Sequence, residues 1–285
     1  MVAPSGPIPA ERISRGIELL RSWRFDVRAG DHVADQHPRL DYLAGSDKDR
    51  AADFQAAWTD PEVRAVWCAR GGYGAQRMVD LLDFDALRAA GPKHLIGFSD
   101  ITALHTRIGR ELGQVTIHGP VGTGSQLDDA PSAAALRSLL SDQPAPGMTV
   151  ITGVALVPGS ATGRLIGGNL ALIAADLGIE PLPAEPSVLI IEDVGEPGYR
   201  LDRMLTQLLR AGYFSNVVGV VLGDFTETDD DELATAVLAD RLTDLGVPVL
   251  QHAAFGHASR NLAVPLGAVG DLDAATGVVR LTTGQ

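Results

Sequence analysis

Apolar and polar positions along the chain follow two periods, one typical of helices and one typical of short buried strands. In the first half, the pattern predicts helices over 9–24, 47–59, 75–90 and 101–112, and strands over 63–69 and 94–97. Strands that alternate with helices form parallel sheets with right-handed crossovers, and ligands bind at the carboxyl ends of such strands. We therefore look for chemistry in the segments that directly follow strands.

The second half alternates in the same way after an irregular connection. A helix is predicted over 132–141, and the stretch 142–147 then lacks periodicity and contains two prolines. We expect two domains, 1–141 and 148–285. The second is predicted to contain strands over 149–157, 163–166, 188–191 and 217–222, helices over 169–177, 201–212 and 232–245, and two terminal strand segments.

Length and composition agree with this division and exclude several classes of protein. The 285 residues suggest roughly two domains at about 150 residues each, and 45% hydrophobic residues are enough for a folded core. The formal charge of -13 repels phosphate backbones and anionic lipid surfaces, so neither nucleic acid nor membrane is an expected partner. The first six residues have neither the basic nor the apolar region that a targeting segment contains, no run of about 18 apolar residues follows, and the single cysteine, Cys68, lies in a predicted apolar strand. These features predict a cytoplasmic protein.

Two segments look like ligand motifs but lack an essential residue. Gly72-Tyr73-Gly74 opens like a dinucleotide fingerprint, yet Arg77 stands where close helix packing requires a small residue. The acidic run 229–232 lacks the glycine and the terminal glutamate of a calcium loop, and it opens a predicted helix. We expect no nicotinamide cofactor and no metal, and we interpret the acidic run as a solvated helix start.

A serine follows the predicted strand 94–97 at a tight turn before a helix. This geometry pushes the hydroxyl of Ser99 into the crevice and directs the backbone N–H of Asp100 to the same place, as a nucleophile and half of an oxyanion hole require. The alternative is that Ser99 or Asp100 only caps the helix that begins at Ile101.

A second turn, Arg70 to Gly74, also follows a buried strand and precedes a helix. Its glycines would let a backbone N–H approach a ligand and supply the second oxyanion donor, or they would only provide the positive φ of a turn. Arg70 at this edge is suited to a substrate carboxylate, although an ordinary surface ion pair explains it equally well.

A serine nucleophile needs a base, and the base needs an orienting acid. Glu192 and Asp193 end an apolar strand in the second half, and His257 lies in a glycine-preceded loop after another strand. Two acids after a strand can also be an ordinary loop, and a loop histidine can be merely solvated. His252 and His118 are competitors that spacing does not exclude.

Taken in order, seven segments resemble the LD-carboxypeptidase family of serine peptidases, and the resemblance starts at Val2. The segments are 70–74, 97–105, 118–120, 167–170, 191–196, 199–204, and 256–257 followed by 265–267. The resemblance implies a flavodoxin-like parallel-sheet N-terminal domain that carries the nucleophile. It also implies a smaller β-rich α/β C-terminal domain that carries the acid and the base.

The resemblance also assigns roles. It implies Ser99 as nucleophile, His257 as general base and then acid, and Glu192 as the orienting acid. The backbone N–H groups of Gly72 and Asp100 would form the oxyanion hole. Arg70 is our candidate for substrate contact, no cofactor is implied, and a homodimer is expected.

Two departures from the family pattern bear on fold and substrate. The family places a whole strand before the segment that starts at Val2, but here only Met1 precedes it. We expect either that the start is misplaced or that the sheet lacks an edge or central strand. The family's microcin C immunity branch carries an extra loop that grips a nucleotide, and the length of this chain leaves little room for one. The murein-peptide branch is therefore favoured.

The leading hypothesis is a serine carboxypeptidase that hydrolyses an LD-amide bond and releases a terminal D-amino acid from murein tetrapeptides in cell-wall recycling. The alternative within the family is a microcin C immunity-type hydrolase of aminoacyl-nucleotide amides. A non-enzymatic ligand-binding module would need neither Ser99 nor its base and acid. A general α/β-hydrolase would need glycine two residues after the serine, where this chain has Ile101.

Overall fold

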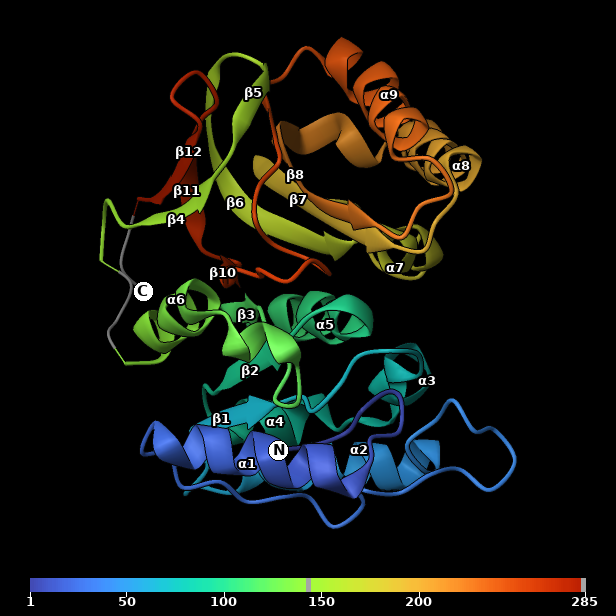
Figure 1. Ribbon diagram of the computed structural model, residues 1–285, viewed down its shortest axis with the longest axis vertical. Helices are drawn as coiled ribbons and strands as arrows, with labels where there is room; N and C mark the ends of the chain where they lie inside the picture. The colour runs from blue at the N-terminus through green and yellow to red at the C-terminus, as the bar shows by residue number, and fades with distance from the viewer. Residues whose placement is uncertain (142–144, 283–285) are drawn as a thin grey trace. The chain divides into compact units, whose positions relative to one another are not determined.

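The structure is a computed structural model that describes residues 1–141 and 145–282. The chain divides into two units, 1–128 and 129–285 (Figure 1). The helix expected over 132–141 lies in the second unit, and that unit is the longer of the two, not the smaller one that we expected. Of the expected connection, residues 142–144 lie outside the described residues.

The first unit contains short parallel strands joined by helices. Its elements are α1 (Ala10–Ser22), α2 (Asp47–Thr59), β1 (Ala65–Trp67), α3 (Ala75–Met78), η1 (Val79–Leu81), α4 (Phe84–Ala90), β2 (His94–Gly97), η2 (Ser99–Ile101), α5 (Thr102–Leu112), β3 (Thr116–His118) and η3 (Ser125–Asp128). The helix predicted over 75–90 is broken, because the side chain of Asp83 accepts the N–H groups of Asp85 and Ala86 and caps a separate helix.

The sheet of the first unit is built from parallel strands, as the expected α/β fold requires. β1 pairs with β2 and β2 with β3, both in parallel. In place of a full first strand, Val2 forms a single parallel bridge with Cys68, and Met1 accepts the N–H of Gly30 at 2.9 Å. The named strands of this unit are neighbours in the order β1, β2, β3, and the bridge of Val2 lies beside Cys68, directly after β1. The expected gap is filled by a bridge.

The core of this unit lies between the helices and the strands. Phe54 and Trp58 of α2 are fully buried, with ring centroids 5.7 Å apart, and they belong to one apolar cluster with Leu104 of α5. Cys68 is in the same cluster, and burial raises the pKa of its thiol. The interpretation of Cys68 as a buried residue is confirmed.

The second unit is rich in strands, as expected. Its elements are α6 (Ala130–Ser141), β4 (Thr149–Thr152), β5 (Val154–Val157), β6 (Ser160–Asn169), α7 (Leu170–Ala175), β7 (Ser187–Val194), α8 (Gly198–Arg210), η4 (Tyr213–Asn216), β8 (Val217–Thr226), α9 (Asp231–Leu242), η5 (Thr243–Leu245), β9 (Val249–Gln251), β10 (Val264–Leu266), β11 (Val269–Asp273) and β12 (Val278–Leu281). Eight of these strands form one sheet in the order β4-β12-β11-β6-β7-β8-β9-β5, in which β6 to β9 are parallel.

The central strand β7 determines where the polar groups of this unit lie. Every residue of β7 before Val194 is buried, which is typical of a strand covered on both faces. Apolar residues of α7, α8 and α9 belong to one buried cluster with residues of β7 and β8, and Leu205 and Ile191 are among its members. Figure 1 shows these helices beside the sheet. Two acids at the end of such a strand are therefore held in a fixed, largely dry place. None of the helices in the described part of the chain is long and apolar enough to cross a lipid bilayer.

Candidate active site

Ser99 sits at a strained turn between β2 and α5. Its φ of +65° lies in the left-handed region, which costs energy for a residue with a Cβ and is common at functional sites. The residues at the N-cap positions of η2 and α5 are Phe98 and Ile101, and neither side chain caps its helix. Whether Ser99 acts as a nucleophile or caps the helix stays a prediction.

The glycine loop (70–74) lies beside Ser99. A Cβ on Gly71 would be 3.0 Å from the Cβ of Ser99 and 3.2 Å from its Oγ, closer than side chains normally pack. Gly72 and Gly74 have φ of +108° and +135°, which other residues rarely adopt. The turn thus needs positive φ and also brings the loop against the serine, while the role of the loop as an oxyanion donor stays a prediction.

The side chain of Arg70 is turned toward the N-terminal segment. Its Nη1 donates a hydrogen bond to the carbonyl oxygen of Pro7 at 2.8 Å, while the residue stays exposed. This bond uses one of the five N–H donors of the guanidinium. The remaining donors are available for a ligand carboxylate at the edge of the glycine loop.

In the second unit, Glu192 and His257 form a close acid–histidine pair. Glu192 is fully buried at the end of β7, and its Oε2 lies 2.6 Å from Nδ1 of His257. A Cβ on Gly256 would be 3.0 Å from the same carboxylate oxygen, so the glycine before the histidine permits this approach. The carboxylate fixes the Nδ1–H tautomer, which leaves Nε2 as the acceptor of a neutral ring.

Charges around His257 favour its protonated form. Burial lowers the pKa of His257, but the hydrogen bond and charge of Glu192, with the charges of Asp193 and Asp224, outweigh it and raise the pKa above its ordinary value. A raised pKa makes the ring a stronger base, which is what proton removal from a hydroxyl requires.

Two residues that the sequence analysis did not single out hold the loop of His257. Oδ2 of Asp224 accepts the N–H of Ala258 at 3.3 Å, and Oδ1 of Asn261 accepts the N–H of Gly256 at 3.1 Å. Asp224 lies in β8, beside β7, so a search of the carboxyl ends of all parallel strands could have found it. Asn261 carries no such signal.

Asp193 has a different task from Glu192. Its carboxylate accepts the side-chain N–H of Asn169 at 2.9 Å and the backbone N–H groups of Ala171 and Val194 at 2.9 and 2.8 Å. Burial and the neighbouring Glu192 raise the pKa of Asp193 to about 6. Asp193 thus ties β7 to the start of α7.

The other candidate histidines lie elsewhere in their units. His252 is exposed, with a φ of +56°. His118 is fully buried in the first unit, where its ring lies 5.9 Å from that of Phe98 and 6.4 Å from that of His105. Of the three candidates, His257 is the histidine that contacts Glu192.

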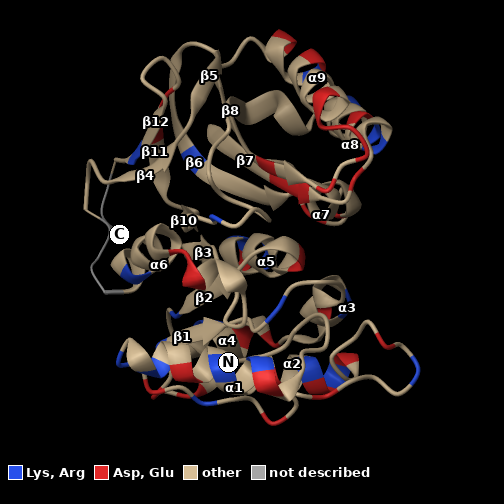
Figure 2. Ribbon diagram, in the orientation of Figure 1, with Lys and Arg blue, Asp and Glu red and all other residues tan. Residues whose placement is uncertain are grey.

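The acidic run before α9 is a helix start, as interpreted. Asp230 accepts the N–H of Leu233 and caps α9, while Asp229 accepts the N–H of Gly198 at 2.9 Å. Figure 2 shows these acids along the segment that leads into α9. Within the described residues, no group of three or more His, Cys, Asp or Glu side chains is arranged to hold a metal ion.

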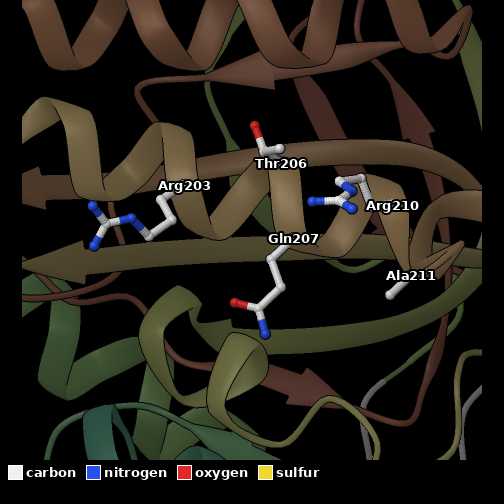
Figure 3. Close-up of a pocket in the computed structure, with 5 residues that line it drawn as sticks. All are labelled: Arg203, Thr206, Gln207, Arg210 and Ala211. Carbon is white, nitrogen blue, oxygen red and sulfur yellow. The ribbon is translucent and has the colours of Figure 1, made fainter.

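A hollow of about 450 Å³ opens along α8, and Figure 3 shows the residues that line it. They are Arg203, Thr206, Gln207, Arg210 and Ala211. The guanidinium of Arg203 stacks over the ring of Tyr199 at 5.2 Å, and Gln207 donates to the carbonyl of Ala174 at 3.4 Å. The hollow contains no acid–base pair, so it is not a candidate for the chemistry.

Comparison with known proteins defines the class as a peptidase. Residues 1–119 match the LD-carboxypeptidase N-terminal domain and residues 162–272 match the LD-carboxypeptidase C-terminal domain. The chain belongs to the LD-carboxypeptidase family, as the sequence motifs indicated.

Individual relatives agree with this assignment over nearly the whole chain. A Streptomyces coelicolor protein named "Putative carboxypeptidase SCO6489" is 52% identical, over 99% of this chain and 92% of its own length. The murein tetrapeptide carboxypeptidase of Pseudomonas aeruginosa is 35% identical, over 94% of this chain and 90% of its own. The structure of MccF in complex with glutamyl sulfamoyl guanosine is similar in fold alone, with a TM-score of 0.87 at 23% identity over 99% and 94% of the two chains. The expected two-domain α/β fold is confirmed.

Proposed function

We propose that the chain is a serine carboxypeptidase that hydrolyses the LD-amide bond before the terminal D-amino acid of murein tetrapeptides. The observation that carries this proposal is the buried carboxylate–imidazole bond between Glu192 and His257. A serine hydrolase needs a general base that a carboxylate orients in this way, and this pair lies within residues 162–272, which match the C-terminal domain of the peptidase family. The murein tetrapeptide carboxypeptidase among the relatives supports the substrate class.

The proposed mechanism begins with attack of Ser99 Oγ on the amide carbonyl carbon, while Nε2 of His257 takes the hydroxyl proton. Glu192 accepts the Nδ1–H of His257 and stabilises the imidazolium. The oxyanion of the tetrahedral intermediate accepts hydrogen bonds from the backbone N–H groups of Gly72 and Asp100.

Collapse of this intermediate breaks the C–N bond. His257 returns the proton to the leaving nitrogen, so that D-alanine departs as a free amino acid and Ser99 keeps the acyl group. A water molecule, deprotonated by His257, then hydrolyses the ester and restores the serine. The reaction consumes one water and needs no cofactor.

Arg70 is proposed to bind the terminal carboxylate of the peptide. The residue is exposed beside the glycine loop, and guanidinium groups pair with carboxylates through parallel hydrogen bonds. A carboxypeptidase must recognise a free carboxylate, and a cationic side chain near the reacting amide can bind it.

A second candidate is hydrolysis of an aminoacyl-nucleotide amide. It is favoured by the fold likeness to MccF, whose structure holds glutamyl sulfamoyl guanosine. The two candidates share the same attack by Ser99 and differ in the leaving group.

Mass spectrometry of murein tetrapeptide after incubation with the protein tests the proposal. We expect loss of one alanine with the wild-type chain and no change with Ser99→Ala. An intact tetrapeptide, together with cleavage of an aminoacyl-sulfamoyl adenosine, would replace the first candidate with the second. The family resemblance further predicts a homodimer that acts in the cytoplasm, which sedimentation and cell fractionation measure.

A further inference from the structure

The carboxylate of Asp100 connects three segments of the first unit. The residue is 1% exposed, and its Oδ2 accepts the hydroxyl proton of Ser5 at 2.5 Å and the N–H of Ala75 at 2.8 Å. Ser5 belongs to the N-terminal segment, and Ala75 begins α3 directly after the glycine loop. The buried carboxylate therefore joins the turn of Ser99 to both.

Arg50 holds the same segments through their carbonyl groups. This arginine of α2 is 2% exposed and donates hydrogen bonds to the carbonyl oxygens of Pro4 and Gly74, the latter at 2.8 Å. It also pairs with Asp47. A Cβ on Gly74 would lie 2.7 Å from Nη1 of Arg50, so this approach requires glycine.

The glycine loop is thereby anchored at both ends. Near its start, the carbonyl of Gly71 accepts the N–H of Gly6 at 3.1 Å, and beyond Gly72 the chain is held by Arg50 and Asp100. Gly72 lies between these anchors. The contacts of Arg50 and Asp100 therefore determine where the backbone N–H of Gly72, the proposed oxyanion donor, lies.

We propose that Asp100 and Arg50 are positioning residues that hold the glycine loop at the separation from Ser99 that oxyanion binding requires. This inference rests on the proposed function. Burial of charged groups costs solvation, and apolar residues of similar size often stabilise a fold as well or better. The charged side chains of Asp100 and Arg50 therefore have a use other than stability, which is to fix the conformation of the glycine loop.

The test is steady-state kinetics of D-alanine release from murein tetrapeptide by Asp100→Asn and Ser5→Ala. The asparagine keeps one acceptor oxygen but loses the charge that binds two donors. We expect kcat to fall roughly 10- to 100-fold, as for a misplaced catalytic group, with KM nearly unchanged. Ser5→Ala, which removes one contact, should lower kcat less, and the two effects should not add because both act through one carboxylate.

Asp53→Asn is the matched control. Asp53 is 7% exposed in the same unit, and its carboxylate contacts the backbone N–H and Nδ1 of His32, both at 2.9 Å. Asp53 lies one turn of α2 from Arg50, but its carboxylate bonds to His32 and not to the segments that Asp100 joins, so Tm should fall while kcat stays. Equal losses of kcat in Asp53→Asn and Asp100→Asn would overturn the positioning role.

A fluorophosphonate probe separates this inference from the proposed substrate. Phosphonylation of Ser99 uses the same nucleophile and oxyanion donors but needs no peptide. If the wild-type chain is labelled but releases no D-alanine, the substrate proposal fails, and the labelling rate still tests the loop. We expect Asp100→Asn to be labelled at least about tenfold more slowly than the wild-type chain. Labelling at the wild-type rate would refute the inference.

Discussion

Oε2 of Glu192 lies 2.6 Å from Nδ1 of His257, inside the second unit and at the end of its central strand. The carboxylate is fully buried, whereas the histidine is partly exposed. This pairing determines which ring nitrogen carries the proton of the neutral histidine, and it sets the sign of the pKa shift.

Replacement of Glu192 by glutamine should damage rate far more than binding. The amide cannot stabilise the imidazolium, and it can favour the wrong tautomer. By analogy with the aspartate of the Ser-His-Asp triad, kcat should fall about 10³- to 10⁴-fold, with KM barely changed. Steady-state kinetics on the tetrapeptide measures both. An unchanged kcat would transfer the orienting task to Asp193 or Glu196.

In the pH profile of kcat/KM, activity should be lost on the acid side at a higher pH than an ordinary histidine would give. His257 must be neutral to accept a proton, so activity is lost as pH falls through its pKa. That pKa is raised above 6.5, because the bond and charge of Glu192 and the charges of Asp193 and Asp224 together outweigh burial. Glu192→Gln should move the acid limb to lower pH. A limb that stays in place would show that another group titrates.

Ser99→Ala should fold normally and lose nearly all turnover. Alanine can occupy the same backbone turn, whose φ is +65°. Loss of a helix cap by the serine would cost only about 1 kcal/mol of stability. His257→Ala should resemble it, and the double variant should be no worse, because the two residues act as a unit. Thermal melting and D-alanine release provide the two measurements. Wild-type activity in Ser99→Ala would exclude this serine as nucleophile.

Local signals predicted some elements well, and contacts distant in sequence explain the rest. Helix α2 begins and ends at the predicted residues, because Ser46 caps it and the pattern is regular. The family motifs led to Glu192 and His257, but the two residues are 65 positions apart, so only the folded chain shows that they are in contact. The contacts of Arg50 with Pro4 and Gly74 join segments far apart in the chain, so no local period could indicate them.

Asp224→Asn should stabilise the protein at high pH. Burial raises the pKa of Asp224 from 3.8 to about 6, so the folded state binds a proton that the unfolded state releases. Stability is therefore lost as pH rises from about 4 to about 6, and it stays low above that range. Asparagine keeps an acceptor for Ala258 and removes this cost, which solvent screening of the half-exposed carboxylate holds below about 3 kcal/mol at pH 8. Denaturation at pH 4 and pH 8 measures the difference, and an equal effect at both would contradict the shift.

Stereochemistry at the last residue is the sharpest test of substrate class. A pocket built for a terminal D-residue holds its carboxylate near Arg70 and accommodates its methyl group on one side. An L-residue would direct the methyl at the wall, which costs about 1 to 3 kcal/mol and gives a preference of roughly tenfold to two-hundredfold. Amidation of the terminal carboxylate should lower the rate further, because it leaves the cationic group unpaired.

The measurement is kcat/KM for three tetrapeptides that end in D-Ala, L-Ala or D-Ala-amide and are otherwise identical. We expect kcat/KM to decrease in the order D-Ala, L-Ala, D-Ala-amide. Arg70→Ala should reduce the difference in kcat/KM between the free acid and the amide and leave the preference for D-Ala over L-Ala unchanged. Lysine at the same position restores the charge without the planar fork and should recover part of that difference. Equal rates on all three peptides would remove the LD-carboxypeptidase assignment of substrate, and faster cleavage of an aminoacyl-sulfamoyl adenosine would favour the nucleotide-amide alternative.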